Sequence, residues 1–189
     1  MVMRQYKVLV AGHFNAGKTT FIKTLSSGEA ISTEKKTYSK EEALVKKLTT
    51  TAMDYGKVKI EDWELSVYGI PGQERFSFMW DVLSKRTDAY IFLVDSSDPS
   101  RWNDTLKQMD SFLAKGEVPY VLCANKTDLP TARPIEEIVE YFNGRVKRVI
   151  PCVAKRRESV ILTVAVLLYE LTGSDKLKDI VKNLREVRS

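Results

Sequence analysis

The chain has 189 residues, of which 43% are hydrophobic and 29% charged, a composition typical of one globular domain with an ordinary core. Its net charge of +5 is a mild basic excess, which does not by itself indicate a nucleic-acid-binding protein, and we expect no specific nucleic-acid partner. Two cysteines and one histidine do not suffice for a disulfide framework or a histidine-based metal cluster. Cys123 and Cys152 therefore predict buried free thiols in a cytoplasmic protein.

Segments of strand character alternate with segments of helical periodicity. Strands are expected at 6–12, 57–62, 63–70, 89–95, 119–125 and 148–154, and helices at 17–28, 78–86, 98–116, 133–144 and 156–173. Several strands are almost continuous apolar runs, as in a parallel sheet covered on both faces. The adjacent runs 57–62 and 63–70 predict a hairpin. We therefore predict an α/β fold whose six-stranded sheet is mostly parallel, with one antiparallel edge strand and helices on both faces.

Two segments fall outside this alternation. Residues 29–50 are polar and poorly periodic, which predicts a long loop before the hairpin. Residues 174–189 form an amphipathic tail beyond a domain at 1–173, and this tail is either docked on the domain or free to contact a partner or a membrane surface weakly. No apolar run is long enough to span a bilayer, and the sequence has no myristoylation glycine or prenylatable cysteine, so we expect no lipid anchor.

The stretch GHFNAGKT, from Gly12 to Thr19, fills every fixed position of the pattern G-x-x-x-x-G-K-[ST]. Its glycines let consecutive backbone N–H groups point at phosphate oxygens, Lys18 adds a positive charge, and Thr19 offers a hydroxyl to Mg²⁺. The loop lies between a predicted strand and a predicted helix, whose N-terminus also favours anions. The sequence thus predicts a nucleotide phosphate site. His13 is expected to contribute through its backbone alone.

The stretch NKTD, from Asn125 to Asp128, follows another apolar strand. A carboxylate at Asp128 can accept hydrogen bonds from guanine N1–H and the 2-amino group, whereas adenine would leave that carboxylate unpaired. At this place in a phosphate-loop chain, the motif predicts guanine rather than adenine as the base.

The ordered motifs GHFNAGKT, TTTAMDYG, GIPGQERF, NKTD and CVAK together resemble those of Ras-like small GTPases, within the P-loop GTPase superfamily, over roughly residues 6–172. The third motif, which begins with glycine, is similar to prokaryotic branches of that family. The resemblance implies a small G domain that binds GTP or GDP with Mg²⁺ and acts as a switch. It also implies slow GTP hydrolysis accelerated by a partner. Two alternatives are a guanine-nucleotide-binding scaffold without hydrolysis and a P-loop kinase.

The resemblance also assigns roles to individual residues. Thr19 and Thr50 would bind Mg²⁺, Gln73 would be the catalytic residue that orients the attacking water, and the Ala154 N–H would meet guanine O6. Thr49 and Thr51 remain alternatives to Thr50. Residues 29–55 and 69–80 would change with the nucleotide and bind regulators or effectors. The full set of implied nucleotide-binding residues is Gly12, Asn15, Ala16, Gly17, Lys18, Thr19, Thr20, Thr50, Gly72, Asn125, Lys126, Asp128, Val153, Ala154 and Lys155.

The third motif departs from the family pattern, because Gly69 stands where the family usually has an aspartate that reaches Mg²⁺ through water. This loss should weaken Mg²⁺ binding without abolishing it, and Asp54 or Asp95 could partly replace the carboxylate. Phe14 also occupies a position where some members need glycine to admit an external arginine. The apolar residues Phe76, Phe78, Met79 and Trp80 predict either core packing of the following helix or an exposed apolar surface.

Overall fold

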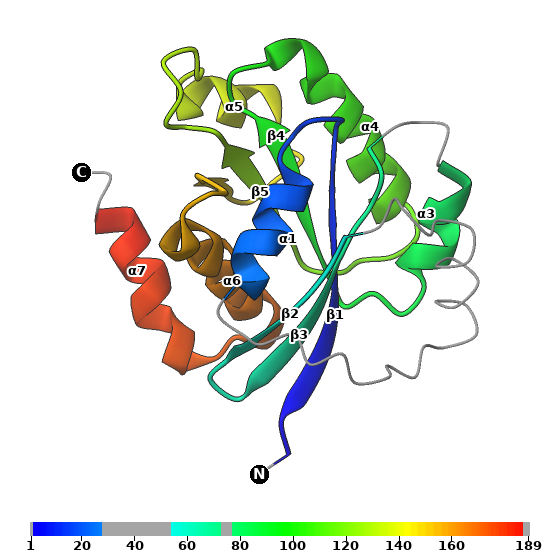
Figure 1. Ribbon diagram of the computed structural model, residues 1–189, viewed down its shortest axis with the longest axis vertical. Coiled ribbons are helices and arrows are strands. Elements are labelled where there is room, and N and C mark those ends of the chain that lie inside the picture. Colours follow the sequence, from blue (N-terminus) through cyan, green and yellow to red (C-terminus); the bar gives the residue numbers. More distant parts are fainter. Residues whose placement is uncertain (1, 28–53, 73–76, 187–189) are drawn as a thin grey trace.

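The computed structural model describes residues 2–27, 54–72 and 77–186, which form a six-stranded sheet with helices on both faces (Figure 1). The strand order is β2-β3-β1-β4-β5-β6, and only the β2–β3 pair is antiparallel. The strands are β1 (Arg4–Gly12), β2 (Asp54–Ile60), β3 (Trp63–Gly69), β4 (Ala89–Asp95), β5 (Tyr120–Asn125) and β6 (Val149–Pro151). The predicted fold class, including the antiparallel edge strand, is confirmed.

The helices follow the strands in an alternating order. They are α1 (Lys18–Ser26), α3 (Ser77–Ser84), α4 (Trp102–Leu113), α5 (Ile135–Tyr141), α6 (Arg157–Thr172) and α7 (Lys178–Glu186), with short 3₁₀ turns η2 (Pro99–Arg101) and η3 (Asp175–Leu177). Pro99 opens η2, where its missing N–H leaves no helical hydrogen bond unmade, and Gly173 ends α6 in the left-handed region with φ 63°. Residues 29–50, predicted as a loop, lie outside the described residues.

The strand boundaries differ most from the prediction in β2 and β6. β2 begins at Asp54 rather than at residue 57, because it pairs with β3 along its whole length, from Ile60 opposite Trp63 to Asp54 opposite Gly69. β6 is limited to Val149–Pro151, and its last residue has no N–H to donate to a ladder. The hairpin register therefore places Asp54 at the same edge of the sheet as the end of β3.

The sheet separates two hydrophobic cores. Along β1, Val8 and Val10 face the core that contains α1, α6 and α7, whereas Leu9 and Ala11 face the core that contains α3, α4 and α5. Because successive residues of a strand point to opposite faces, both cores need apolar residues, which explains the uninterrupted apolar runs. Figure 1 shows α1, α6 and α7 together on one side of the sheet.

The C-terminal segment lies against the domain up to the end of the described residues. Leu177 and Val181 are buried in the same core as α6, so η3 and the first part of α7 are docked. Figure 1 shows α7 running beside α6. None of the helices in residues 2–27, 54–72 and 77–186 combines the length and the apolar character needed to cross a membrane.

Candidate functional site

The sequence motifs meet at one edge of the sheet. The parallel strands β1, β3, β4, β5 and β6 all run in the same direction, so their carboxyl ends lie together, and the loops that follow them carry the motifs. In open α/β sheets this edge is where ligands bind. The fold therefore brings together the loop after β1, the turn after β3 and the loops after β5 and β6.

The loop between β1 and α1 has a backbone that only particular residues can adopt. Gly17 has φ 103°, and a Cβ there would lie 2.2 Å from Asn125 Nδ2. Gly12 has φ 150°, and a Cβ there would lie 2.4 Å from the carbonyl oxygen of Leu93. Asn15 adopts φ 65°, which asparagine tolerates better than most residues. The loop is thus fixed against β4 and β5 before it leads into the N-terminus of α1 at Lys18.

Lys18 points back into this loop. Its Nζ donates to the carbonyl oxygens of Gly12 and His13, both at 2.7 Å. Burial lowers the pKa of Lys18 to about 8, while the nearby carboxylate of Asp54 opposes that shift. An anion placed within the loop would favour the charged ammonium, so the site is electrostatically suited to phosphate.

Asn125 joins three of the motifs. Its buried side-chain amide donates from Nδ2 to the carbonyl oxygen of Ala16 at 2.9 Å, and its Oδ1 accepts from the Ala154 N–H at 2.9 Å. The first of these bonds joins residues 109 positions apart. The phosphate loop, NKTD and CVAK are therefore tied together by one side chain.

The same amide changes the role that the resemblance implied for Ala154. The Ala154 N–H donates to Asn125 in this structure, so its partner is a side chain of the chain itself. The N–H of Val153 donates to Ser159 Oγ at 2.8 Å, and Lys155 is exposed beside them. A contact from Ala154 to a guanine carbonyl would have to share this hydrogen bond.

Lys126 makes a second link between NKTD and the phosphate loop. Its Nζ donates to the Asn15 carbonyl oxygen at 2.9 Å and to Asp95 Oδ2 at 2.5 Å. Burial would raise the pKa of Asp95, but hydrogen bonds from Lys126 and Ser97 outweigh it and hold that pKa below its usual value. Asp128 follows in the same turn and is exposed, so its carboxylate is accessible to a ligand.

The edge next to β2 has a different arrangement. Thr19, exposed at the start of α1, donates its hydroxyl hydrogen to Asp54 Oδ2 at 2.6 Å, and Thr20 behind it is half-buried. Asp54 lies directly opposite Gly69 in the hairpin. Thr50 and Gln73, the other two residues given roles at this edge, lie outside the described residues.

Gly72 packs directly on the phosphate loop. A Cβ at this position would lie 2.7 Å from the Gly12 carbonyl oxygen and 2.8 Å from the Phe14 nitrogen, so only glycine fits without movement. The turn after β3 is therefore in contact with the loop that is predicted to hold phosphates.

Two residues of α4 that the sequence analysis did not single out shape this loop. Gln108, only 2% exposed on α4, accepts from the Gly12 N–H at 2.9 Å and donates to the carbonyl oxygens of Gly12 and Gly72 at 3.1 and 3.2 Å. Thr105, one turn earlier, accepts from the His13 N–H at 2.9 Å. The sequence signal that could have identified them is their position on the apolar face of an amphipathic helix. A buried polar group at such a position needs a hydrogen-bond partner.

The His13 ring is a structural group. Its Nε2 accepts from the Asp95 N–H at 2.9 Å, which requires a neutral ring that carries its proton on Nδ1, next to the Phe14 carbonyl oxygen at 2.8 Å. Burial lowers the pKa of His13, and the nearby Lys18 ammonium acts in the same direction. The prediction that only the backbone of His13 contributes was therefore incomplete, since the side chain fixes the end of β4.

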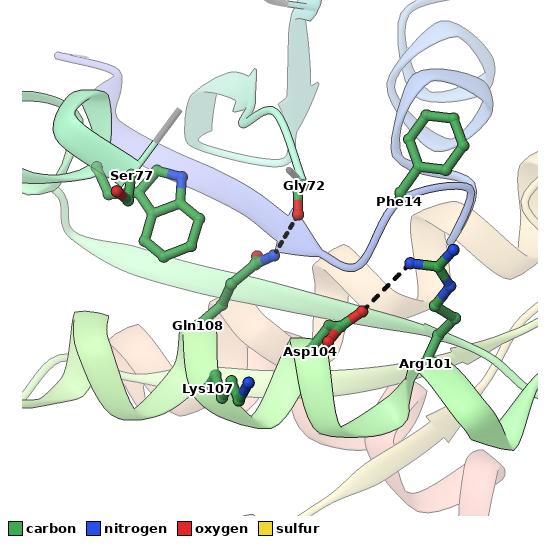
Figure 2. A pocket seen from close by; sticks show the side chains of 8 residues that line it. Phe14, Gly72, Ser77, Arg101, Asp104, Lys107 and Gln108 are labelled. Carbon is green, nitrogen blue, oxygen red and sulfur yellow. Dashed lines mark hydrogen bonds and ion pairs between the residues drawn. The ribbon is translucent and has the colours of Figure 1, made fainter. Parts of the chain in front are cut away.

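A cleft of about 660 Å³ lies beside the phosphate loop, between Gly72 and α4. Figure 2 shows Gln108 reaching across to the Gly72 carbonyl, with Phe14 on the loop side.

The apolar residues at the start of α3 have different environments. Trp80 is buried and packs on Phe112 with ring centroids 5.7 Å apart, whereas Phe78 is 58% exposed, as is Phe14 at 55%. Of the two predictions for these apolar residues, core packing is therefore correct for Trp80 and surface exposure for Phe78. Phe76 and the side chain of Met79 lie outside the described residues.

A family model and two curated relatives indicate the same protein family. The model of the ADP-ribosylation factor family matches residues 1–179. ADP-ribosylation factor-like protein 3 of Saccharomyces cerevisiae is 30% identical over 184 residues, which cover 91% of this chain and 88% of that protein. ADP-ribosylation factor-related protein 1 of Bos taurus is 28% identical over 148 residues, 77% of this chain and 71% of that protein.

Both relatives are eukaryotic, so the likeness to prokaryotic branches of the family is not supported. The match of the family model extends over nearly the whole chain, and the motifs meet at one edge of the fold. The chain therefore belongs to the ADP-ribosylation factor family of small P-loop GTPases.

Proposed function

We propose that this protein is a molecular switch that binds GTP or GDP together with Mg²⁺ and hydrolyses GTP slowly. The observation that carries this proposal is the junction at Asn125, whose two hydrogen bonds hold the phosphate loop and the base-reading motifs in one frame. Such a frame suits one ligand that contacts both motifs, as a nucleotide does with its phosphates and its base.

In this proposal the phosphates lie in the loop from Gly12 to Thr20. The backbone of Asn15, Ala16 and Gly17 and the ammonium of Lys18 bind the phosphate oxygens, and the Gly72 N–H senses the γ-phosphate. The contact of Gly72 with the loop supports that last role.

The base lies against the loops after β5 and β6. Asp128 accepts from the guanine N1–H and 2-amino groups, Lys126 and Lys155 flank the ring, and the Ala154 N–H is shared between Asn125 and guanine O6. Val153, whose N–H is held by Ser159, keeps this backbone in place. Adenine would leave the Asp128 carboxylate without a donor.

The donor set around Thr19 fits a magnesium ion bound with the nucleotide. Because Thr19 gives its hydrogen to Asp54, the lone pairs of its oxygen remain free for a cation. Thr50, from the first switch segment, would be the second protein ligand. When bound, Mg²⁺ would neutralise charge on the phosphates and help to position them.

Hydrolysis in this proposal depends on Gln73, which orients the attacking water. The segment 29–55 contains no arginine, so the chain lacks an obvious arginine of its own in the first switch. An arginine contributed by a partner accelerates such reactions by about 10³–10⁵-fold. We propose slow turnover in the isolated protein, with regulators and effectors bound through residues 29–55 and 69–80.

We place the switch domain at residues 1–173, with residues 174–189 as its C-terminal extension, in the cytoplasm. One observation favours a second candidate function, a guanine-nucleotide-binding scaffold without hydrolysis. Gly69 leaves the third motif without its usual carboxylate, and a weaker magnesium site would slow hydrolysis further.

Nucleotide competition and phosphate release test the proposal together. We expect a fluorescent GDP analogue to bind the purified chain and to be displaced by GDP and GTP but not by ADP or ATP. Single-turnover phosphate release from GTP should be slow and should be suppressed in Gln73→Leu, which keeps nucleotide binding. Displacement by ATP would contradict the guanine site. Binding with no release above that of Gln73→Leu would favour the scaffold.

A further inference from the structure

The end of the β2–β3 hairpin explains what stands in place of the missing carboxylate. Asp54 and Gly69 are direct partners in the antiparallel pair, so their side chains point to the same face of the sheet. That face is the one covered by α1, where Thr19 donates to Asp54 Oδ2 at 2.6 Å. A carboxylate therefore reaches Thr19 from β2, although the carboxyl end of β3 offers none.

The two positions compete for the same space. A Cβ at Gly69 would lie 3.2 Å from Asp54 Cβ and 3.5 Å from Asp54 Oδ2. The first of these distances is shorter than most Cβ contacts in real proteins. The same Cβ would also lie 2.8 Å from Cδ1 of Ile22, which is buried on α1. An aspartate at 69 would thus place a second carboxylate against the first. The glycine at 69 and the aspartate at 54 form one coupled feature.

Asp95, the second candidate to replace the missing carboxylate, is already engaged. Its Oδ2 pairs with Lys126 at 2.5 Å, and its Oδ1 accepts from the N–H and hydroxyl of Ser97 at 2.9 and 2.6 Å. These bonds commit it to the base-reading side of the site. Asp54, by contrast, accepts the hydrogen bond from Thr19 and lies close enough to Lys18 to affect the pKa of that ammonium.

We propose that Asp54 is the positioning residue of the magnesium site, supplying from β2 the carboxylate that the third motif lacks at Gly69. This inference rests on the proposed nucleotide-binding function. Asp54 orients the Thr19 hydroxyl so that its lone pairs face the cation, and it can accept a hydrogen bond from a water that Mg²⁺ retains. A carboxylate that acts through another ligand in this way tunes metal affinity without touching the nucleotide.

The first test measures release of a fluorescent GDP analogue from the full chain, from excess EDTA to millimolar Mg²⁺. In Asp54→Asn, which keeps the shape and an acceptor oxygen but loses the charge, we expect the Mg²⁺ concentration for half-maximal slowing of release to rise about 10- to 100-fold. Release in EDTA should change far less than release in Mg²⁺, because the backbone contacts of the phosphate loop and the contacts to the base remain. The matched control is Asp62→Asn, which removes one charge at the other end of the same hairpin and should leave the Mg²⁺ curve unchanged.

Three outcomes have different meanings. If wild type binds no guanine nucleotide, the proposed function fails and the inference fails with it. If wild type shows Mg²⁺-dependent release and Asp54→Asn follows the same curve, only the inference fails. Faster release of Asp54→Asn in EDTA, with no shift along the Mg²⁺ axis, would also overturn the inference, since it would reveal a purely structural role.

A swap of the carboxylate between strands gives an independent test should Asp54→Asn fold poorly. Both swap proteins carry Ile22→Val, which removes the Cδ1 atom that crowds position 69. In this background, we expect Asp54→Gly to raise the Mg²⁺ concentration for half-maximal slowing of release about 10- to 100-fold. Adding Gly69→Asp to Asp54→Gly should reverse most of this rise. Failure of the added Gly69→Asp to shift the curve back would overturn the inference.

Discussion

The two ends of the proposed nucleotide site are held together in different ways. On the side of β4, β5 and β6, Asn125, Lys126 and Gln108 make hydrogen bonds that tie the phosphate loop to three other parts of the chain. On the side of β2, the side-chain link described between the start of α1 and the edge strand of the sheet is the hydrogen bond from Thr19 to Asp54. The first side is a connected network, whereas the second depends on one carboxylate.

The difference shows where a motif of this family can change. A group inside a network cannot be lost without leaving several buried partners unsatisfied. A group at an edge can be replaced when a neighbouring strand brings the same chemistry to the same place. This is how we interpret Gly69, whose missing carboxylate is opposite Asp54.

The largest effect is expected from breaking the network at its centre. Asn125→Ala removes both bonds of the amide and leaves the Ala16 carbonyl and the Ala154 N–H buried without their partner. We expect a loss of about 2–4 kcal/mol in the free energy of unfolding, measured with urea. Guanine-nucleotide affinity should fall about 100-fold, which corresponds to roughly 3 kcal/mol.

This variant also separates the two sides of the site. Its loss of affinity should be the same in EDTA and in Mg²⁺, in contrast to the Mg²⁺-specific effect expected for Asp54→Asn. Asn103→Ala, at an exposed position of α4, is the matched control and should behave as wild type. An Asn125→Ala protein that binds GDP as tightly as wild type would remove the basis for the connected network.

A smaller effect is expected from breaking the link to α4. Gln108→Leu leaves the Gly12 N–H without an acceptor and cuts the bond to the Gly72 carbonyl. We expect a loss of about 1–3 kcal/mol in the free energy of unfolding, measured by urea denaturation. Gln5→Leu, at an exposed position of β1, removes a hydrogen bond to Glu64, which Lys57 also contacts, and should cost less than about 1 kcal/mol. Equal stability of the two variants would show that Gln108 is not a structural link.

The smallest effect concerns His13 and acid pH. Burial lowers its pKa in the folded protein, whereas the unfolded chain has the ordinary value of about 6.5. As pH falls below that value, the unfolded state takes up a proton that the native state does not, so the free energy of unfolding should fall between about pH 6.5 and the lower native pKa. Lys18, Asp95 and Asp98 are the charged groups that act on the ring.

Because His13 is the single histidine of the chain, the test has one target. Urea unfolding measured at several pH values from neutral to mildly acidic should show this decline in wild type, and His13→Gln should flatten it. The same slope in both proteins would assign the pH dependence to carboxylates instead of the ring.

Much of the fold could be predicted from the sequence, because the relevant signals are local. β4 was predicted at 89–95 and is found at Ala89–Asp95, since a buried central strand is a continuous apolar run with sharp polar ends. The start of β2 was missed by three residues, because Asp54 and Tyr55 read as polar on their own and join the strand only through pairing with β3. Pairing between strands is not a local property.

The candidate site divides in the same way. The glycines of the phosphate loop, Lys18 and Asp128 could be identified because their chemistry is encoded in short motifs of fixed spacing. The hydrogen bond of Gln108 with the phosphate loop and the ring contacts of His13 could not be predicted from the sequence. Each of them depends on which elements pack together at the strand ends.

The sequence by itself thus determined the alternation of elements, the nucleotide motifs and the gap at Gly69, since these follow from local hydrophobic pattern and residue order. Only the tertiary structure separated the two candidates for that gap, because it pairs Asp95 with Lys126 and brings Asp54 to Thr19. Asp54 faces Thr19, 35 positions away, because the hairpin register sets it opposite Gly69 and α1 crosses the same face. Contacts across such separations depend on register and topology, which no short stretch of sequence specifies.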